Sequence, residues 1–522
     1  MGNAVARTAL GEDRMTGQTE RLHGERAIRS IVIAGGGTAG WMAAAMLARR
    51  LDKQPVQITV IESSTIGTVG VGEATVPGIR DFFRELGVTE REVMAATKGT
   101  AKLGIEFVDW KRPGHSFFHP FGLYGMRSRG VAFHHYWQKL RSAGDPVELA
   151  DYCLATVMAK RNLFMLPTDR PVHDLLFFDW AVHFDAGLFA QFLAARAVAG
   201  GVRRVDATIT NVRINGETGL VDGVDTACGK AIDGDLFIDC TGFRSLLLGA
   251  ALGSGYEDWS NLLPCDRAVA IPCERAGPLT PFTRSTAFAQ GWQWRIPLQH
   301  RVGNGLVYAS RHLSDDAAID TLRSRLEGAP LAEPNLIRFR TGHRRDFWRG
   351  NCIGLGLAAG FMEPLESTSI TLIQTGIEKL LALFPDRDFD PALASEYNRS
   401  TTLEYERIRD FLLLHYWAND RRGEPMWDQC RDTALPDPLA HKLRLFRANG
   451  SLVRYEWESF HDPSWLSMYA GFDIAARSHD RAADYFSVPD LQSALARMRE
   501  SIGKAVALAE PHDAFLRTYG VG

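Results

Sequence analysis

A glycine-rich turn between an apolar strand and a helix constrains this chain more than any other feature. The stretch "RSIVIAGGGTAGWMAAAMLARRL" (29–51) opens with the apolar run 31–33, which is typical of a parallel strand buried on both faces. Gly35, Gly37 and Gly40 then form the pattern G-x-G-x-x-G. The first glycine permits a tight turn, the second lets backbone approach a pyrophosphate, and the third lets helix and strand pack closely. The turn therefore predicts a dinucleotide site at the start of the helix.

A second strand follows at the distance that such a site requires. The stretch "VQITVIES" (56–63) carries Glu62 near its end, about 20 residues after Gly40, where an acidic residue is expected to bind the ribose hydroxyls. The predicted cofactor site therefore contains Glu62 and the start of the helix, with Thr38 and Ala39.

Two later stretches favour FAD as the dinucleotide. The stretch "GDLFIDCTGFRS" (234–245) is a strand that ends at Asp239 and is followed by Gly242, similar to the second fingerprint of FAD enzymes. The stretch "NCIGLGLAAGFMEP" (351–364), with Gly356, resembles the element that passes under a flavin ring. Its glycines also fit an NADP-type pattern, but the acidic residue expected ~20 residues later is absent.

Composition excludes several classes of protein. The chain has 522 residues and a net charge of −3, so it has no basic surface typical of nucleic-acid binding. Its seven cysteines form no C-x-x-C pair, which argues against a disulfide framework or a metal site and favours the reducing cytoplasm. We see no signal peptide and no apolar run of the ~18–20 residues that span a membrane.

Four stretches, in order and with similar spacing, resemble the flavin-dependent tryptophan halogenases. They are "GGGTAGW" (35–41), "GVGEATVP" (70–77), "WQWRIP" (292–297) and "FMEPLESTSI" (361–370). The resemblance runs from about residue 29 to about residue 420, and W-x-W-x-I-P is the family's own signature. It implies an FAD enzyme in which Gly72, Glu73 and Ala74 also lie beside the cofactor.

The signature stretch "GWQWRIPLQH" (291–300) is by itself a short strand. Alternate residues face opposite sides, so Trp292 and Trp294 share a face, and Pro297 ends the pairing. Two core aromatics would fit this pattern as well. The resemblance instead implies that Trp292, Trp294, Ile296 and Pro297 wall the space between flavin and substrate, and disfavour direct oxygen transfer to the substrate ring.

The chemistry implied by the resemblance begins at the flavin, which carries the oxidative step. Reduced flavin and O₂ give a C4a-hydroperoxide, and attack by a halide ion (chloride or bromide) on its outer oxygen gives hypohalous acid. Thr368 and Ser369 match the residues that bind halide, and consecutive amides of their turn could form an anion nest. Ser369 replaces the glycine that is usual there.

Two further residues match catalytic positions of the family. Lys102 lies on an apolar stretch, so we expect it to be buried with a lowered pKa, and to hold hypohalous acid or form a haloamine with it. Glu366 matches the glutamate that accepts the ring proton or polarises the oxidant. The alternatives are a surface lysine and a helix-capping glutamate. Lys98 is expected to be a surface lysine, and Glu363 to be structural.

The match weakens at the substrate end. His119 and Phe121 match positions that stack on indole. In "RYEWESFHDPSWLSMYAGF" (454–472), Glu456 and Phe460 match substrate-binding positions, and His461 stands where a tryptophan is usual. The preceding segment is shorter than in tryptophan-specific members and lacks the tyrosine pair that clamps the amino-acid end. We therefore expect a more open pocket for indole, a substituted indole or a larger substrate.

The expected architecture is one α/β body. It combines a GR2-like, Rossmann-type FAD-binding module with an interleaved mixed-sheet substrate module and a helical C-terminal part. The module is expected from about 29–112, 190–255 and 345–390. The expected domain ranges are a disordered segment 1–28, the FAD-binding body 29–390 and a mainly helical part that caps the substrate, 391–522.

Two other classes of flavoprotein would have the same glycine turn. A single-component flavin aromatic monooxygenase would oxidise NAD(P)H itself and would not need Lys102 or the tryptophan pair. A non-enzymatic flavin-binding sensor would lack a shielded lysine. Because no second nucleotide site is convincing, we expect a separate NAD(P)H flavin reductase to supply FADH₂ for a small aromatic substrate. The sequence leaves a homodimer open.

Overall fold

The structure, a computed structural model, describes residues 26–66, 72–168 and 170–521. The FAD-type sheet has six strands in the order β21-β22-β13-β1-β2-β9. Their bounds are β1 Ser30–Ala34, β2 Gln57–Glu62, β9 Arg203–Asp206, β13 Leu236–Asp239, β21 Trp348–Arg349 and β22 Cys352–Gly354. The first two strands and helix α2 (Thr38–Arg50) confirm the predicted strand–turn–helix–strand order.

The second large sheet has seven strands in the order β19-β15-β18-β17-β16-β5-β6. Their bounds are β5 Gly104–Val108, β6 Ser116–Pro120, β15 Arg267–Ala270, β16 Thr283–Phe288, β17 Gly291–Pro297, β18 Val302–Tyr308 and β19 Asn335–Arg338. Strand β17 carries the tryptophan pair at the middle of the sheet and ends at Pro297, as predicted. Because β5 runs parallel to β16 while the other neighbours are antiparallel, the sheet is mixed.

A separate three-stranded sheet contacts the seven-stranded sheet through its strand β3. It has the order β3-β8-β4, with β3 Gly72–Ala74, β4 Thr100–Lys102 and β8 Ala181–Asp185. Both β3 and β4 pair antiparallel with β8. After β2 the chain leaves the FAD-type sheet, and the expected module segment 29–112 remains a prediction.

Three smaller sheets complete the strands. They are β10-β11-β12 (Ile209–Ile214, Val221–Thr226, Ala231–Asp233), β14-β20-β23 (Tyr256–Asp258, Gly342–Arg344, Gly360–Phe361) and β24-β7 (Glu510–Pro511, Leu163–Phe164).

Helices cover both large sheets and form most of the C-terminal part. Those before residue 390 are α3 Ile79–Leu86, α4 Glu90–Thr97, α5 Phe133–Ser142, α6 Leu154–Lys160, α7 Ala186–Ala199, α8 Asp315–Ser324 and α9 Ser369–Ala382. Those after it are α10 Pro391–Trp417, α11 Pro425–Asp432, α12 Asp437–Asn449, α13 Asp462–Gly471, α14 Val488–Val506 and α15 His512–Thr518. None of the helices in the described ranges combines the length and apolarity that a membrane crossing requires.

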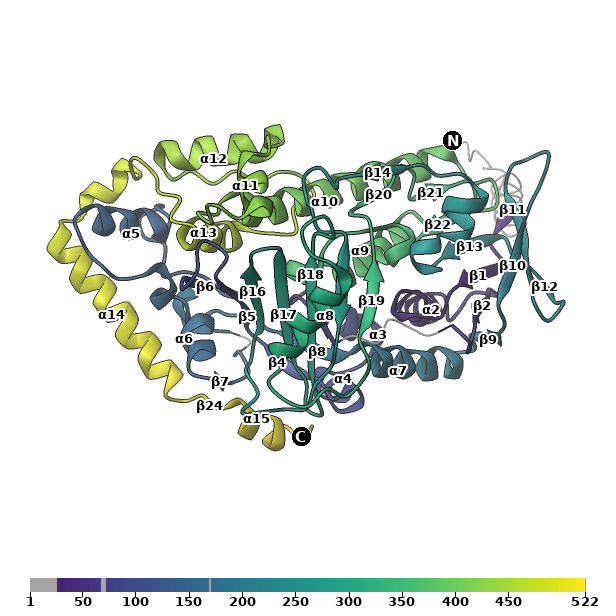
Figure 1. Cartoon of the computed structure of the whole chain (residues 1–522), viewed down its shortest axis with the longest axis horizontal. Helices are drawn as coiled ribbons and strands as arrows, with labels where there is room; N and C mark the ends of the chain where they lie inside the picture. Colours follow the sequence, from purple (N-terminus) through teal and green to yellow (C-terminus); the bar gives the residue numbers. More distant parts are fainter. Residues whose placement is uncertain (1–25, 67–71, 169, 522) are drawn as a thin grey trace, which may run out of the picture.

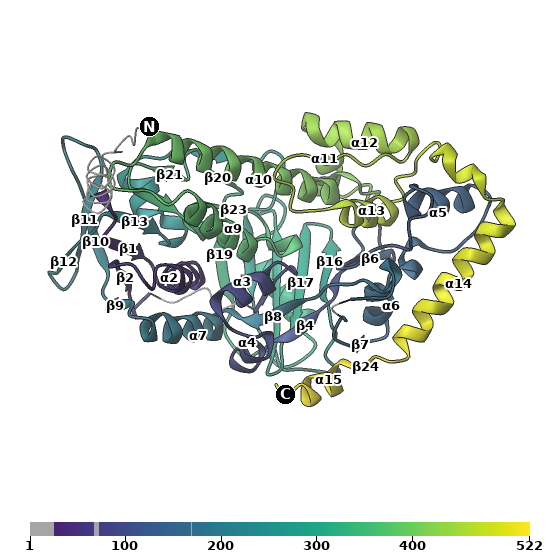
Figure 2. The same cartoon turned by 180° about the vertical axis from the view of Figure 1, so that it is seen from behind.

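The arrangement puts the two sheets side by side along the long axis. Figure 1 shows the six-stranded sheet toward one end, α5 and α12 to α14 toward the other, and the seven-stranded sheet between them. Figure 2 shows α9 between α10 and α2, so α9 links the FAD-type sheet to the rest of the body. The predicted domain boundaries remain predictions, and most of segment 1–28 lies outside the described residues.

Candidate active site

The glycine turn lies at the carboxyl edge of the six-stranded sheet. Gly35 has a φ of +108°, and a Cβ there would lie 2.3 Å from the carbonyl oxygen of Cys240. A Cβ on Gly40 would lie 1.9 Å from the carbonyl oxygen of Gly35. By contrast, a Cβ on Gly37 would meet no described atom within 4 Å. The turn is therefore closed on its protein side and open at the position where a pyrophosphate would approach.

Glu62 lies directly against this turn. Its Oε2 accepts a hydrogen bond from the indole Nε1 of Trp41 at 3.1 Å, and its Oε1 lies 2.5 Å from Nε of Arg204. A Cβ on Gly36 would lie only 1.8 Å from Oε2. The carboxylate is thus fixed at the end of β2, in the place expected for a group that binds ribose.

Asp239 is held by its own following turn, and its predicted contact with the cofactor remains a prediction. Its Oδ1 accepts hydrogen bonds from the backbone and hydroxyl of Thr241, and its Oδ2 accepts from the amides of Leu247 and Leu248. The side chain is fully buried. Because its own turn supplies these donors, Asp239 shapes the backbone that leads to Gly242.

The remaining predicted cofactor residues lie around the start of α2. Gly242 has a φ of +69°, and a Cβ there would meet no described atom within 4 Å. Gly356 has a φ of +61°, and its Cβ would lie 2.8 Å from the Cβ of Ala39. The segments after β13 and β22 contact each other there. These close backbone approaches and the open turn fit a flavin dinucleotide.

Glu73 lies on β3 and is partly buried, between the buried Gly72 and Ala74. Burial raises its pKa to about 7, so the neutral acid is populated near neutral pH.

Lys102 is the last residue of β4 and is fully buried, as predicted. Its Nζ donates hydrogen bonds to the carbonyl oxygen of Thr75 and to Oγ of Ser367, each at 2.9 Å. Nζ also lies 5.1 Å from the ring centre of Phe121. Burial lowers the pKa of Lys102 to about 7, although the negative charge of Glu366 acts in the opposite direction. Lys98, in contrast, is exposed.

Glu366 lies in a 3₁₀ turn (Pro364–Glu366) just before α9 and is buried. Its Oε2 lies 2.8 Å from Nδ1 of His119, and its Oε1 lies 2.8 Å from Nε2 of His415. Burial alone would raise the pKa of Glu366, but the two histidines outweigh it and lower the pKa to about 2. The carboxylate is therefore ionised and bound on both oxygens.

The turn after Glu366 has the features of an anion site. Ser367 has a φ of +61°, Thr368 returns to the right-handed helical region, and α9 begins at Ser369. The first amides of a helix have no partner within it. The buried Oγ1 of Thr368 also has no hydrogen-bond partner among the described residues. Amides and a hydroxyl are thus available at one end of α9, next to the partner of Lys102.

The two tryptophans of β17 lie on one face, with ring centres 6.2 Å apart. The indole Nε1 of Trp292 donates to Oε2 of Glu363 at 3.0 Å, and the hydroxyl of Tyr416 donates to the same oxygen. Trp294 pairs with Gly305, where a Cβ would collide with its ring. Burial raises the pKa of Glu363 to about 7, so this acid is a buried anchor for Trp292.

Three of the predicted substrate residues gather around Glu366 and Lys102. The ring centre of His119 lies 6.4 Å from that of Phe121 and 6.2 Å from that of Phe460. Phe460 stacks on Phe411 with ring centres 3.9 Å apart. These aromatic planes lie beside the buried lysine and carboxylate.

Glu456 and His461 do not join this group, and their predicted contacts with the substrate remain predictions. Both are exposed, and the carboxylate of Glu456 lies 2.9 and 3.2 Å from the guanidinium nitrogens of Arg399 on α10. The ring Nε2 of His461 lies 3.2 Å from Arg454. A local pattern cannot reveal a partner such as Arg399, which lies 57 residues earlier in the chain.

Sequence reasoning missed Thr75, Ser367, His415 and Tyr416. The only sequence signal for the last two was a pair of polar side chains after the apolar run "FLLL" (411–414) in α10. These neighbours hold the two glutamates of the "FMEPLES" loop: His415 contacts Glu366, and Tyr416 contacts Glu363.

The comparisons with known proteins agree with this geometry. The chain matches the family model described as tryptophan halogenase over residues 30–488. It is 38% identical to tryptophan 6-halogenase SttH of Streptomyces toxytricini over 80% of this chain and 83% of that protein. The solved structure of BrvH, a flavin-dependent halogenase from Brevundimonas sp. BAL3, is similar with a TM-score of 0.92, 50% identity, and coverage of 94% and 99% of the two chains. Xcc4156, a flavin-dependent halogenase from Xanthomonas campestris, gives a TM-score of 0.91, 43% identity, and coverage of 95% and 99%.

Proposed function

The chain belongs to the tryptophan halogenase family, and on that premise we propose that it halogenates a small, electron-rich aromatic molecule of the indole type. The reaction uses reduced FAD, O₂ and chloride or bromide, and a separate NAD(P)H flavin reductase supplies the FADH₂. The observation that carries the proposal is the buried amine of Lys102, which shares Ser367 with the anion-binding turn and lies beside Glu366.

The glycine turn and its neighbours hold the flavin. The start of α2 receives the pyrophosphate and Glu62 receives the ribose, while Gly242 and Gly356 allow close approach of backbone to the cofactor. Gly72, Glu73 and Ala74 of β3 lie beside it. When bound, reduced FAD supplies hypohalous acid from O₂ and halide.

The turn before α9 holds the halide. The hydrogen-bond donors for the halide are the amides of Thr368 and Ser369 and the hydroxyl of Thr368, which has no partner among the described residues. Glu366, the acidic residue of this turn, does not point at them, because histidines bind both of its oxygens. Trp292, Trp294, Ile296 and Pro297 form a buried wall that limits the escape of the oxidant and the entry of water.

Lys102 receives the hypohalous acid and Glu366 completes the substitution. The lone pair of Nζ attacks the halogen, the N–halogen bond forms as the O–halogen bond breaks, and the hydroxide leaves as water with a proton from nitrogen. As the ring takes the halogen, the N–halogen bond breaks, its electron pair stays on Nζ, and Nζ regains a proton from the water formed in the first step. Glu366 accepts the proton that the ring carbon loses and returns it to the resulting hydroxide.

The open pocket favours a substrate without an amino-acid end. His119, Phe121 and Phe460 provide aromatic planes for an indole. Glu456 is committed to Arg399 on the surface, so it supplies no free carboxylate to an ammonium group. The name of SttH assigns tryptophan to that relative; for this chain we propose free or substituted indole instead.

The test offers indole and tryptophan side by side with FAD, a flavin reductase, NADH, O₂ and either halide, and reads the products by mass. We expect halogenated indole to form with a larger kcat/KM than halogenated tryptophan. Comparable turnover of tryptophan would refute the open-pocket part of the proposal. An oxygenated product without halogen would favour the flavin aromatic monooxygenase, and a Lys102 that titrates normally in a protein that never consumes halide would favour the sensor.

Two finer expectations accompany the proposal. A cytoplasmic location is supported by seven cysteines that are all free thiols. A homodimer is testable by light scattering of the purified protein.

A further inference from the structure

Three basic side chains surround a single ionised carboxylate in the buried centre. Lys102, His119 and His415 lie around Glu366, and each of the four residues is at most 2% exposed. An interior of this kind stabilises few unbalanced charges. The identity of the basic group that carries the positive charge therefore determines the chemistry of the centre.

The contacts of His415 require two N–H groups. Its Nδ1 lies 2.8 Å from the carbonyl oxygen of Phe411, which can only accept a hydrogen bond, and its Nε2 lies 2.8 Å from Oε1 of Glu366. A neutral imidazole has one N–H, whereas the imidazolium has two. The alternative is a protonated Glu366, but an imidazole ordinarily holds a proton about two pKa units more tightly than a carboxylate does, and Oε2 of Glu366 has a second hydrogen-bond partner in His119. The shared proton therefore belongs on His415.

The other two basic groups do not need a charge. His119 satisfies Oε2 of Glu366 through Nδ1 alone, as a neutral tautomer can, and its Nε2 makes no recorded hydrogen bond to another described residue. Lys102 makes no hydrogen bond to Glu366, and its two acceptors are Thr75 and Ser367. A neutral amine has two N–H groups for these two acceptors, which leaves its lone pair free.

We propose that His415, held as an imidazolium, is the counter-ion of Glu366 and thereby favours the neutral amine of Lys102 over its ammonium form. His415 is a positioning residue, since it acts through Glu366. The inference rests on the proposed function, in which the lone pair of Lys102 attacks hypohalous acid.

The surroundings of His415 supply no other described counter-charge. Its ring neighbours are the aromatic side chains Phe107, Trp110, Phe411 and Phe472, with ring centres 5.0 to 6.2 Å away. Glu366 also contacts His119, and Glu363 and Tyr416 lie close to Glu366 and His415 in the chain. Glu363 and Tyr416 are hydrogen-bonded to each other.

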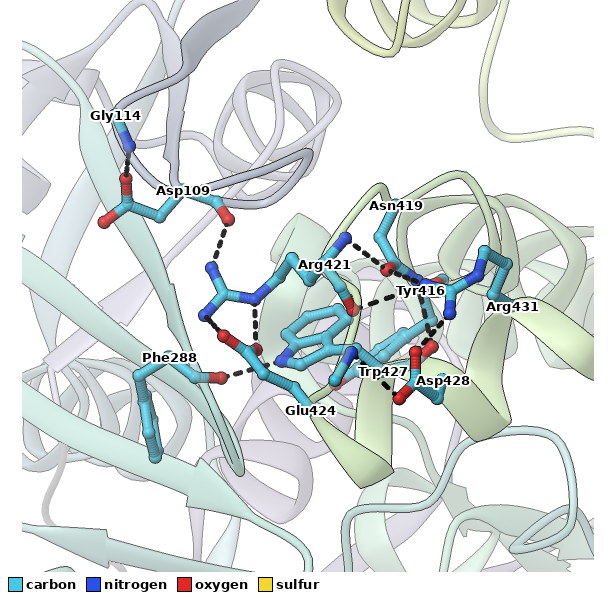
Figure 3. Close-up of polar contacts among 11 residues, drawn as sticks. Asp109, Gly114, Phe288, Tyr416, Asn419, Arg421, Glu424, Trp427, Asp428 and Arg431 are labelled. Carbon is cyan, nitrogen blue, oxygen red and sulfur yellow. Dashed lines mark hydrogen bonds and ion pairs between the residues drawn. The ribbon is translucent and has the colours of Figure 1, made fainter.

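A polar cluster fixes the end of α10 that carries His415. Figure 3 shows Arg421 pointing to the carbonyl oxygen of Asp109 and to Glu424, above the ring of Trp427. Trp427 in turn donates to the carbonyl oxygen of Phe288 at 2.8 Å. The segment after α10 is thus anchored to the β5–β6 and β16–β17 turns, and His415 is held against Glu366.

The test measures the pKa of Lys102 directly by NMR, in protein labelled with ¹³C at lysine Cε. The signal of Lys102 is assigned as the one that is lost in Lys102→Met. His415→Gln keeps a side-chain donor for Glu366 but cannot carry the proton. Tyr416→Phe is the matched control, because it removes a hydrogen bond to Glu363 from the neighbouring buried residue. This measurement needs no turnover, so its outcome is separate from that of the halogenation assay.

We expect His415→Gln to raise the pKa of Lys102 by about one unit, because Glu366 then has no other buried cation. Tyr416→Phe should leave it unchanged. The halogenation profile of His415→Gln should move to higher pH by the same amount. An unchanged pKa of Lys102 in folded His415→Gln would overturn the proposal, as would an equal shift in both variants.

Should His415→Gln fail to fold, neutron diffraction from crystals of the wild-type protein decides the question. The proposal predicts deuterium on both ring nitrogens of His415 and none on Oε1 of Glu366. A single deuterium on His415 would refute it.

Discussion

At the scale of the residue, the centre depends on burial acting on two ionisable groups in opposite directions. Desolvation lowers the pKa of Lys102 from 10.5 to about 7. Desolvation also opposes the ionisation of Glu366, yet His119 and His415 keep it ionised. A neutral nucleophile and a permanent carboxylate can therefore coexist at the same pH.

The pH dependence of halogenation follows from these two groups. Because the pKa of Lys102 is lowered to about 7, the neutral amine grows from roughly one tenth of the molecules at about pH 6 to roughly nine tenths at about pH 8. Glu366, at about 2, stays ionised throughout. We expect the rate of halogen transfer under saturating FADH₂ to rise about ninefold over this interval and then level off. A rate that falls as pH rises through 7 would mean that the ammonium form is the active one.

At the scale of the element, the turn between β1 and α2 is the part whose sequence and structure agree most closely. Its signals are local: an apolar strand, three spaced glycines and a helix. Gly37 occupies the N-cap position of α2 with extended backbone and no described atom near its missing Cβ. A substitution at Gly37 should therefore change cofactor binding without lowering the stability of the fold.

This geometry gives a prediction for Gly37→Asp. Aspartate is favoured at an N-cap, so the stability of the apoprotein should not fall. Its carboxylate would enter the space of the pyrophosphate, and we expect FAD affinity to fall at least about tenfold, or ~1.4 kcal/mol. Gly216→Asp, at an exposed turn with equally open space, is the control. Calorimetric titration with FAD measures both, and wild-type affinity in Gly37→Asp would show that the phosphates bind elsewhere.

Asp239 shows why the role of a predicted site residue cannot be read from its own motif alone. A carboxylate at the end of a buried strand fits two arrangements: contact with a ligand, or hydrogen bonds to its own following turn. The sequence is the same for both, and the choice depends on how residues 241 to 248 fold back. The contact of Glu456 was missed for a related reason, because its partner Arg399 comes from another element.

At the scale of the whole molecule, the centre is assembled from segments far apart in the chain. Lys102 and Ser367 are 265 residues apart, and Glu366 and His415 are 49 apart. The sequence predicted Lys102 and Glu366 because motifs surround them. It could not predict His415, whose place depends on the packing of α10 against the two sheets.

The anchoring of α10 gives a prediction for Arg421. Its guanidinium is nearly buried and binds Glu424 and the carbonyl oxygen of Asp109 (Figure 3). Arg421→Ala leaves these acceptors unpaired, and we expect the free energy of unfolding to fall by about 2–3 kcal/mol. This is somewhat less than for a fully buried pair, because Glu424 is partly exposed. Arg422→Ala, at the exposed neighbouring position, should change little. Urea unfolding compares the two, and equal midpoints would contradict the anchoring role.

The most direct test of the whole account compares wild type, Lys102→Met and Lys98→Met with FAD, a flavin reductase, NADH, O₂, bromide and indole. We expect wild type and Lys98→Met to form bromoindole. Lys102→Met should bind FAD normally yet lose at least about a hundredfold in halogenation rate. Bromoindole formation by Lys102→Met at the wild-type rate would contradict the claim that the buried amine of Lys102 passes the halogen to the ring.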